Sequence, residues 1–85
     1  MSKKFYRFVG KIEDVEKSKI PLQQKQILRS MYDLCKDNKE GRFQGFEIVD
    51  NAKSKFKLET RQKSTVLFAW YARNNEERGF SKIVE

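Results

Sequence analysis

The sequence predicts a small α+β domain in which three helices form the core and two terminal strands pair in a small antiparallel sheet. The first observation behind this class is a period-two alternation of side chains at each end of the chain, which is typical of strands. The second is that apolar residues recur every three or four positions in three intervening segments, which is typical of helices. The third is length, because 85 residues allow one domain, residues 1–85, with a limited core.

The first predicted element is a strand over residues 4–12, with the sequence KFYRFVGKI. Aromatic residues fall on both faces of this strand, so we expect both faces to be partly covered. Residues 13–19 are charged and irregular, and we expect them to form a link.

A helix is predicted next, over residues 20–41. Pro21 suits its first position, where the missing N–H costs nothing. Gly41 can adopt the left-handed geometry that ends a helix. The apolar stripe of this helix consists of Leu28, Met31, Leu34 and Cys35.

A short second helix is predicted within residues 42–58. Its acidic residues, Glu47 and Asp50, lie near its start and its lysines near its end, where each sign complements the helix dipole. Arg42 and Phe43 are expected to form a bridge of one or two residues to the sheet. The buried side of the helix is expected to contain Ile48, Val49, Ala52 and Phe56.

The third predicted helix covers residues 59–79 and ends at Gly79. Thr60 is the expected N-cap, with Ser64 as the alternative. The spacing of Trp70 predicts that it lies in the core, whereas Phe68 falls off the stripe and is the better candidate for an exposed aromatic residue. The expected stripe consists of Val66, Leu67, Trp70, Tyr71 and Asn74.

Residues 80–85, FSKIVE, alternate again and predict the closing strand. A lone strand is not stable, so we expect the two terminal strands to pair with each other against the helices. Each strand would keep one open edge, and a homodimer in which a second copy covers that edge is one expected way to protect it.

The charge of the chain is +7 and is concentrated in residues 52–73, which carry six cations against Glu59 alone. A concentrated basic segment is typical of proteins that bind a polyanion such as nucleic acid. The alternative is a basic protein that has no such partner. The six cations are Lys53, Lys55, Lys57, Arg61, Lys63 and Arg73.

The residues absent from the sequence exclude several classes of chemistry. There is no histidine, which excludes zinc sites of the Cys/His type and imidazole-dependent triads, and Cys35 is the only cysteine. We therefore expect a protein that is not an enzyme and has no metal or other cofactor. No apolar run is long enough to span a bilayer, and we expect a cytoplasmic protein without a membrane partner.

The order of these elements, with a short connection near residues 57–61, resembles the helix-turn-helix core of winged-helix DNA-binding domains. In that family the amino-terminal half of the third helix faces DNA, which implies contacts from Arg61, Gln62, Lys63, Thr65 and Arg73. Only FSKIVE follows that helix, so the chain departs from the family by lacking a full carboxy-terminal wing. The stretch TRQKSTVLFAWYARNNEERGF is also similar to small uncharacterised proteins encoded by bacteriophages, which implies no activity.

Two functions remain open from the sequence. In the first, the chain is a phage or cellular transcriptional regulator that binds nucleic acid, DNA rather than RNA. The binding residues would be the six cations of residues 52–73 together with Gln62 and Thr65. Phosphate contacts at the start of the third helix would supply its affinity. The second is a protein-interaction module that binds and modulates a host or cellular protein complex, with the basic segment docked on an acidic partner.

Overall fold

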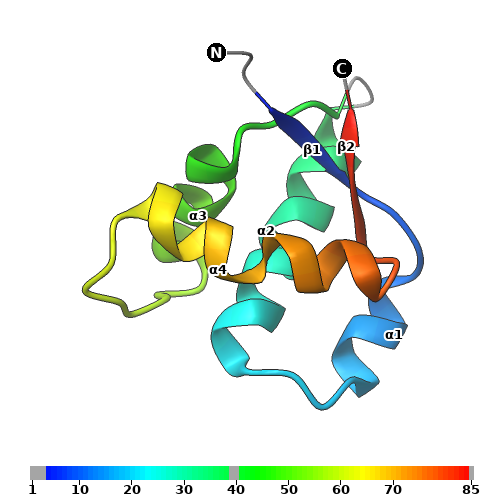
Figure 1. Cartoon of the computed structure of the whole chain (residues 1–85), viewed down its shortest axis with the longest axis horizontal. Helices are drawn as coiled ribbons and strands as arrows, with labels where there is room; N and C mark the ends of the chain where they lie inside the picture. The colour runs from blue at the N-terminus through cyan, green and yellow to red at the C-terminus, as the bar shows by residue number, and fades with distance from the viewer. Residues whose placement is uncertain (1–3, 39–40, 85) are drawn as a thin grey trace.

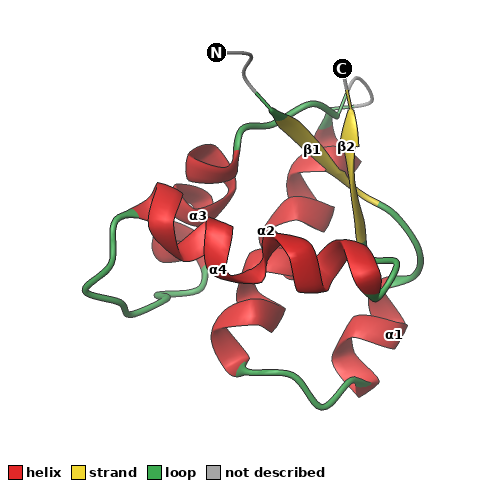
Figure 2. Cartoon of the chain, in the orientation of Figure 1, coloured by secondary structure: helices red, strands yellow, loops and turns green. Residues whose placement is uncertain are grey.

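The computed structural model describes residues 4–38 and 41–84, and within them the chain forms four helices and two strands. Strand β1 covers Phe5–Phe8 and strand β2 covers Ser81–Val84. The helices are α1 (Ile12–Lys17), α2 (Leu22–Asp37), α3 (Gly45–Lys55) and α4 (Ser64–Glu77). This confirms an α+β domain, and Figures 1 and 2 show the two-stranded sheet at one side of the helices.

The expected pairing of the two ends of the chain is confirmed. The strands β1 and β2 are antiparallel, with Phe5 opposite Val84 and Phe8 opposite Ser81. Phe43 also forms the expected bridge, because the Tyr6 N–H donates to the Phe43 carbonyl at 2.8 Å. Within the described residues β2 pairs with β1 alone, so the homodimer through its other edge stays a prediction.

The expectation that residues 13–19 form an irregular link was wrong, because α1 occupies Ile12–Lys17. Glu13 and Asp14 lie in the first turn of α1 and Lys17 lies in its last turn, so these charges complement the helix dipole. Val15, which is 1% exposed, anchors the short helix in the core. The strand expected over residues 4–12 is correspondingly shorter.

The three predicted helices all form, with shorter bounds than expected. Pro21 precedes α2 as its N-cap residue instead of opening the helix. Helix α3 begins with a capping box in which the Glu47 carboxylate accepts the Gln44 N–H at 2.8 Å. The short connection expected near residues 57–61 is instead a loop over residues 56–63, longer than the three- or four-residue turn of a helix-turn-helix.

The core lies between α2, α3 and α4, and the sheet covers one end of it. The predicted buried side of α3 is confirmed, because Ile48, Val49 and Ala52 have no exposed surface. Helices α3 and α4 are in close contact where Gly45 faces the Phe68 ring, and a β-carbon at position 45 would lie 2.5 Å from Phe68 Cδ2. This close approach determines where α4 and the loop before it lie relative to α3.

Candidate nucleic-acid interface

The amino end of α4 begins at Ser64, and its N-cap residue is Lys63. The Ser64 hydroxyl donates to the Asp50 carboxylate of α3, and Lys53 Nζ donates to Ser64 Oγ at 3.0 Å. A carboxylate of the protein itself therefore lies at the positive end of the helix dipole, where the sequence predicted a phosphate. Lys53 bonds to the same hydroxyl and is therefore committed to the contact between α3 and α4.

The expectation that Thr60 is the N-cap was wrong, because the helix starts four residues later. Thr60 forms a local turn instead, in which the Gln62 N–H donates to Thr60 Oγ1 at 3.1 Å. Consequently Arg61, Gln62 and Lys63 precede α4 and do not form its first turn. The side chains of these three residues are exposed.

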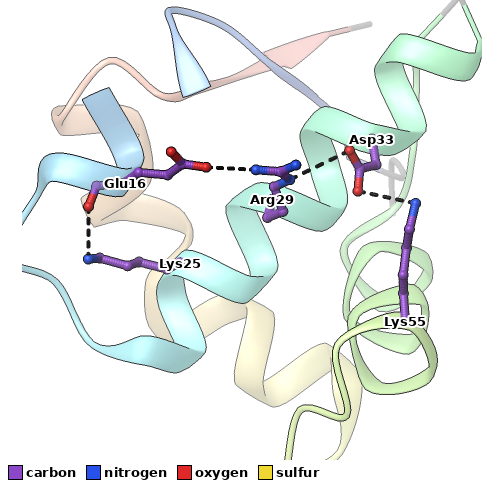
Figure 3. A network of polar contacts seen from close by, with 5 residues as sticks. All are labelled: Glu16, Lys25, Arg29, Asp33 and Lys55. Atoms are coloured by element: carbon purple, nitrogen blue, oxygen red, sulfur yellow. Dashed lines mark hydrogen bonds and ion pairs between the residues drawn. The ribbon is translucent and has the colours of Figure 1, made fainter. Parts of the chain in front are cut away.

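The six cations of residues 52–73 separate into two groups. Lys53, Lys55 and Arg73 have local partners. Lys55 Nζ lies 3.2 Å from the Asp33 carboxylate, within the network drawn in Figure 3, and Arg73 Nε lies 3.1 Å from Glu77. In the described part of the chain, no ion pair or side-chain hydrogen bond involves the other three cations, Lys57, Arg61 and Lys63.

These three cations lie on the loop of residues 56–63, which we call the cationic loop, and the loop is anchored to the protein at several points. Gln26 Nε2 of α2 donates to the Phe56 carbonyl at 3.2 Å, and Gln23 Nε2 donates to the Glu59 carbonyl at 2.8 Å. Leu58 is 5% exposed and packs in the core. The loop extends away from the helices at the left of Figure 1, where it is coloured yellow-green.

The outer face of α4, defined as Thr65, Val66, Ala69, Trp70 and Arg73, is exposed along its length. Trp70 is 59% exposed and Val66 is 40% exposed, whereas Phe68 is 3% exposed. The expected positions of Trp70 and Phe68 were therefore both wrong. Phe68 packs edge-on against Tyr6, with the ring centroids 4.6 Å apart, and the indole of Trp70 faces solvent.

A surface pocket of about 200 Å³ lies beside the outer face of α4. Thr65 and Ala69 of α4 line it together with Phe46 of α3, Tyr6 of β1 and Lys4. Burial, and to a smaller extent the Glu76 carboxylate, raise the pKa of the Tyr6 hydroxyl above its ordinary value. Sequence reasoning missed Phe46, although its position two residues before Ile48 places it outside the buried stripe of α3.

The side chains that commonly hold metal ions are not clustered in the described part of the chain. Within residues 4–38 and 41–84, no group of three acidic, cysteine or histidine side chains is placed to hold a metal ion. Cys35 is half-buried on α2, and its sulfur accepts the Phe8 N–H at 3.4 Å. The arrangement of the cationic loop and α4 is suited to binding through charge and aromatic contact.

Comparison with known proteins does not add a relative to this description. No family model, curated protein or solved structure matches the chain. Among the described helices, none combines the length and apolar character needed to cross a membrane.

Proposed function

We propose that this chain is a non-enzymatic nucleic-acid-binding protein whose contact surface is the cationic loop together with the outer face of α4. The observation that supports this function is the set of three exposed cations within seven residues, Lys57, Arg61 and Lys63, that lack a local acidic partner in the described structure. The loop carries only Glu59 against them. An anchored segment with a net positive charge attracts a polyanion, and most of the binding affinity then comes from contacts to phosphates.

The charge of the cationic loop differs from that of the other lysine-rich segment. Lys11, Lys17 and Lys19 flank or belong to α1 and are also exposed. That segment carries three acidic residues as well, Glu13, Asp14 and Glu16, so its net charge is zero. Opposite charges spaced closely cancel beyond a Debye length of about 8–10 Å. The loop is therefore the better site for a polyanion.

Duplex DNA is the target that the resemblance to winged-helix domains implies, with transcription regulation as the role. The packing of α3 against α4 and the exposed positions of Thr65 and Arg73 on α4 are compatible with that mode of binding. The Asp50 carboxylate at the start of α4 and the longer loop favour contacts from the loop to phosphates over base reading by the first helical turn.

The test is a fluorescence anisotropy titration of labelled DNA, duplex and single-stranded, at salt concentrations from about 50 to 200 mM. Each phosphate contact adds roughly 0.7–0.9 to the slope of log affinity against log salt. We expect the triple variant Lys57→Gln, Arg61→Gln and Lys63→Gln to weaken binding and to reduce this slope by about 2–3. Glutamine keeps the length and polarity of the side chains while it removes their charge.

The matched control is the triple variant Lys11→Gln, Lys17→Gln and Lys19→Gln, which removes the same net charge from exposed positions around α1. It is expected to retain nearly the full salt slope. Equal losses in the two triple variants would assign binding to net charge and would overturn the loop as the site. Absence of binding at low salt to either form of DNA would overturn the proposed function.

A protein-interaction module is the second candidate, and the exposed indole of Trp70 favours it, because tryptophan is enriched among interface residues that dominate binding. Nuclease treatment separates the two functions. A protein complex captured by the chain survives nuclease if the contact is direct and is lost if nucleic acid links the two.

A further inference from the structure

The most unusual side chain on the surface is Trp70, the only tryptophan of the chain. It is 59% exposed, although a rotation of α4 by about one residue would turn it toward the core. The core face of α4 is filled by Leu67 and Phe68, which are 0% and 3% exposed. The indole is therefore held outward by the packing of its neighbours on the same helix.

Cations lie at both sides of Trp70 along the helix. Lys63, the exposed N-cap residue of α4, precedes Trp70 by seven residues in the chain. A rise of 1.5 Å per residue puts about 10 Å between them along the axis, close to one Debye length at physiological salt. Arg73 follows Trp70 by one turn, and its surface pair with Glu77 contributes little to stability, so it does not prevent another contact.

An aromatic face beside cations matches the chemistry of an unpaired nucleotide. Every base presents a π-face that stacks on an aromatic side chain, and the adjoining phosphates are neutralised by neighbouring Lys and Arg. In a duplex both faces of each base are covered by its neighbours, and opening one step costs a few kcal/mol. The cations alone would fit either form of nucleic acid, whereas an exposed indole adds affinity only where bases are unpaired.

We propose that Trp70 stacks on an unpaired base while the cationic loop holds the adjoining phosphates, so that the chain prefers single-stranded nucleic acid to duplex. This inference rests on the proposed function and specifies its substrate class. The charge of the loop favours a polyanion over a neutral apolar partner at this face.

The experiment uses the intrinsic fluorescence of Trp70, which reports its own surroundings without interference from another tryptophan. The full chain is titrated with an oligothymidylate of about 15 nucleotides and with a duplex of the same length. We expect the single strand to quench the fluorescence and to bind more tightly than the duplex. Stacking of one base predicts that Trp70→Ala weakens single-strand binding roughly 5- to 150-fold, measured by anisotropy of labelled DNA.

Two further variants make the result specific. Trp70→Phe keeps an aromatic face and is expected to retain most of the affinity for the single strand. Ile83→Ala removes another exposed apolar side chain, on β2, and is expected to leave binding unchanged. Circular dichroism confirms that each variant is folded.

Distinct outcomes overturn the inference and the proposed function. Salt-dependent binding that leaves the fluorescence unchanged, or a Trp70→Ala affinity within about twofold of the parent, overturns base stacking and leaves the proposed function standing. Equal affinity for duplex and single strand also overturns the inference. Failure of the parent chain to bind either form at low salt overturns both.

Discussion

The close approach of α3 and α4 at Gly45 makes the substitution Gly45→Ala a direct test of the helix arrangement. The added β-carbon would lie 2.5 Å from Cδ2, 2.6 Å from Cγ and 3.1 Å from Cβ of Phe68. Carbon atoms in contact normally lie about 3.5–4.0 Å apart. Phe68 is 3% exposed and packs against Tyr6. Its ring also lines the surface pocket beside α4, but rotation of the ring about its own axis does not move the Cγ and Cβ atoms that the new β-carbon would meet.

Two effects of opposite sign determine the magnitude. Overpacking of a core typically costs about 1–3 kcal/mol, and alanine gains at most about 1 kcal/mol over glycine from helix propensity. We expect Gly45→Ala to lower the free energy of unfolding by about 1–2 kcal/mol. For a domain of this size that loss lowers the Tm by about 5–15 °C, which thermal unfolding followed by circular dichroism measures.

A double-mutant cycle with Phe68→Leu assigns the loss to the contact. The smaller side chain should relieve the overlap, so the cost of Gly45→Ala should fall when Phe68 is already leucine. Gly79→Ala is the control, because Gly79 has φ of 78° with open space around it and its cost comes from the backbone alone. A stabilising Gly45→Ala, or a coupling below about 0.5 kcal/mol, would refute the helix crossing described above.

Two further predictions concern the half-buried Tyr6 and the buried Gln24. Burial, followed by the Glu76 carboxylate, raises the pKa of Tyr6 above its ordinary value near 10, so the unfolded chain deprotonates first and the free energy of unfolding falls above about pH 10. The urea midpoint should therefore fall between about pH 9 and about pH 11, and it should fall less in the Tyr6→Phe variant than in the parent. Gln24→Ala should lower the free energy of unfolding by about 1–3 kcal/mol in urea, because Gln24 Nε2 donates to the fully buried Asn75 Oδ1 at 2.7 Å, and an unchanged urea midpoint would contradict this role.

The sequence allowed the sheet and the three longer helices to be predicted because their patterns are repeated. Period-two alternation at both ends of the chain was sufficient to expect β1 and β2, and the stripe at Ile48, Val49 and Ala52 was sufficient to orient α3. Helix α1 was missed because six residues are too few to show a helical period. Val15 is its only buried residue, and the pattern of charges at its two ends was the available signal.

The orientation of α4 could not be deduced because its apolar segment is unbroken. Residues 66–72, VLFAWYA, contain no charged or amide side chain that would mark the exposed face. Leu67 and Tyr71 belong to the buried side in either orientation, and the choice between Phe68 and Trp70 depends on the fit of Phe68 against Gly45 and Tyr6. This packing brings together residues that are distant in sequence, so the local periodicity of the α4 segment does not predict it.

The cations of the candidate interface could be located from the sequence, but their partners could not. Lys55 pairs with Asp33, a residue of another helix, and Lys53 is held at the junction of α3 and α4. Only the tertiary structure separates these residues from Lys57, Arg61 and Lys63. The surface proposed to bind a polyanion is therefore narrower than the basic segment suggests.

The exposure of Trp70 has a thermodynamic cost that supports a role in binding. A tryptophan side chain buries about 150–250 Å² when it is fully covered, and Trp70 leaves 59% of its surface in water. At about 25 cal/mol per Å², the chain forgoes roughly 2–4 kcal/mol of hydrophobic stabilisation at this position. That is a substantial amount for a domain whose total stability is of the order of 5–15 kcal/mol. A polar residue at position 70 would avoid the exposed apolar ring without removing any contact from the core. The proposed contact with a partner that covers the indole would account for its place on the outer face of α4.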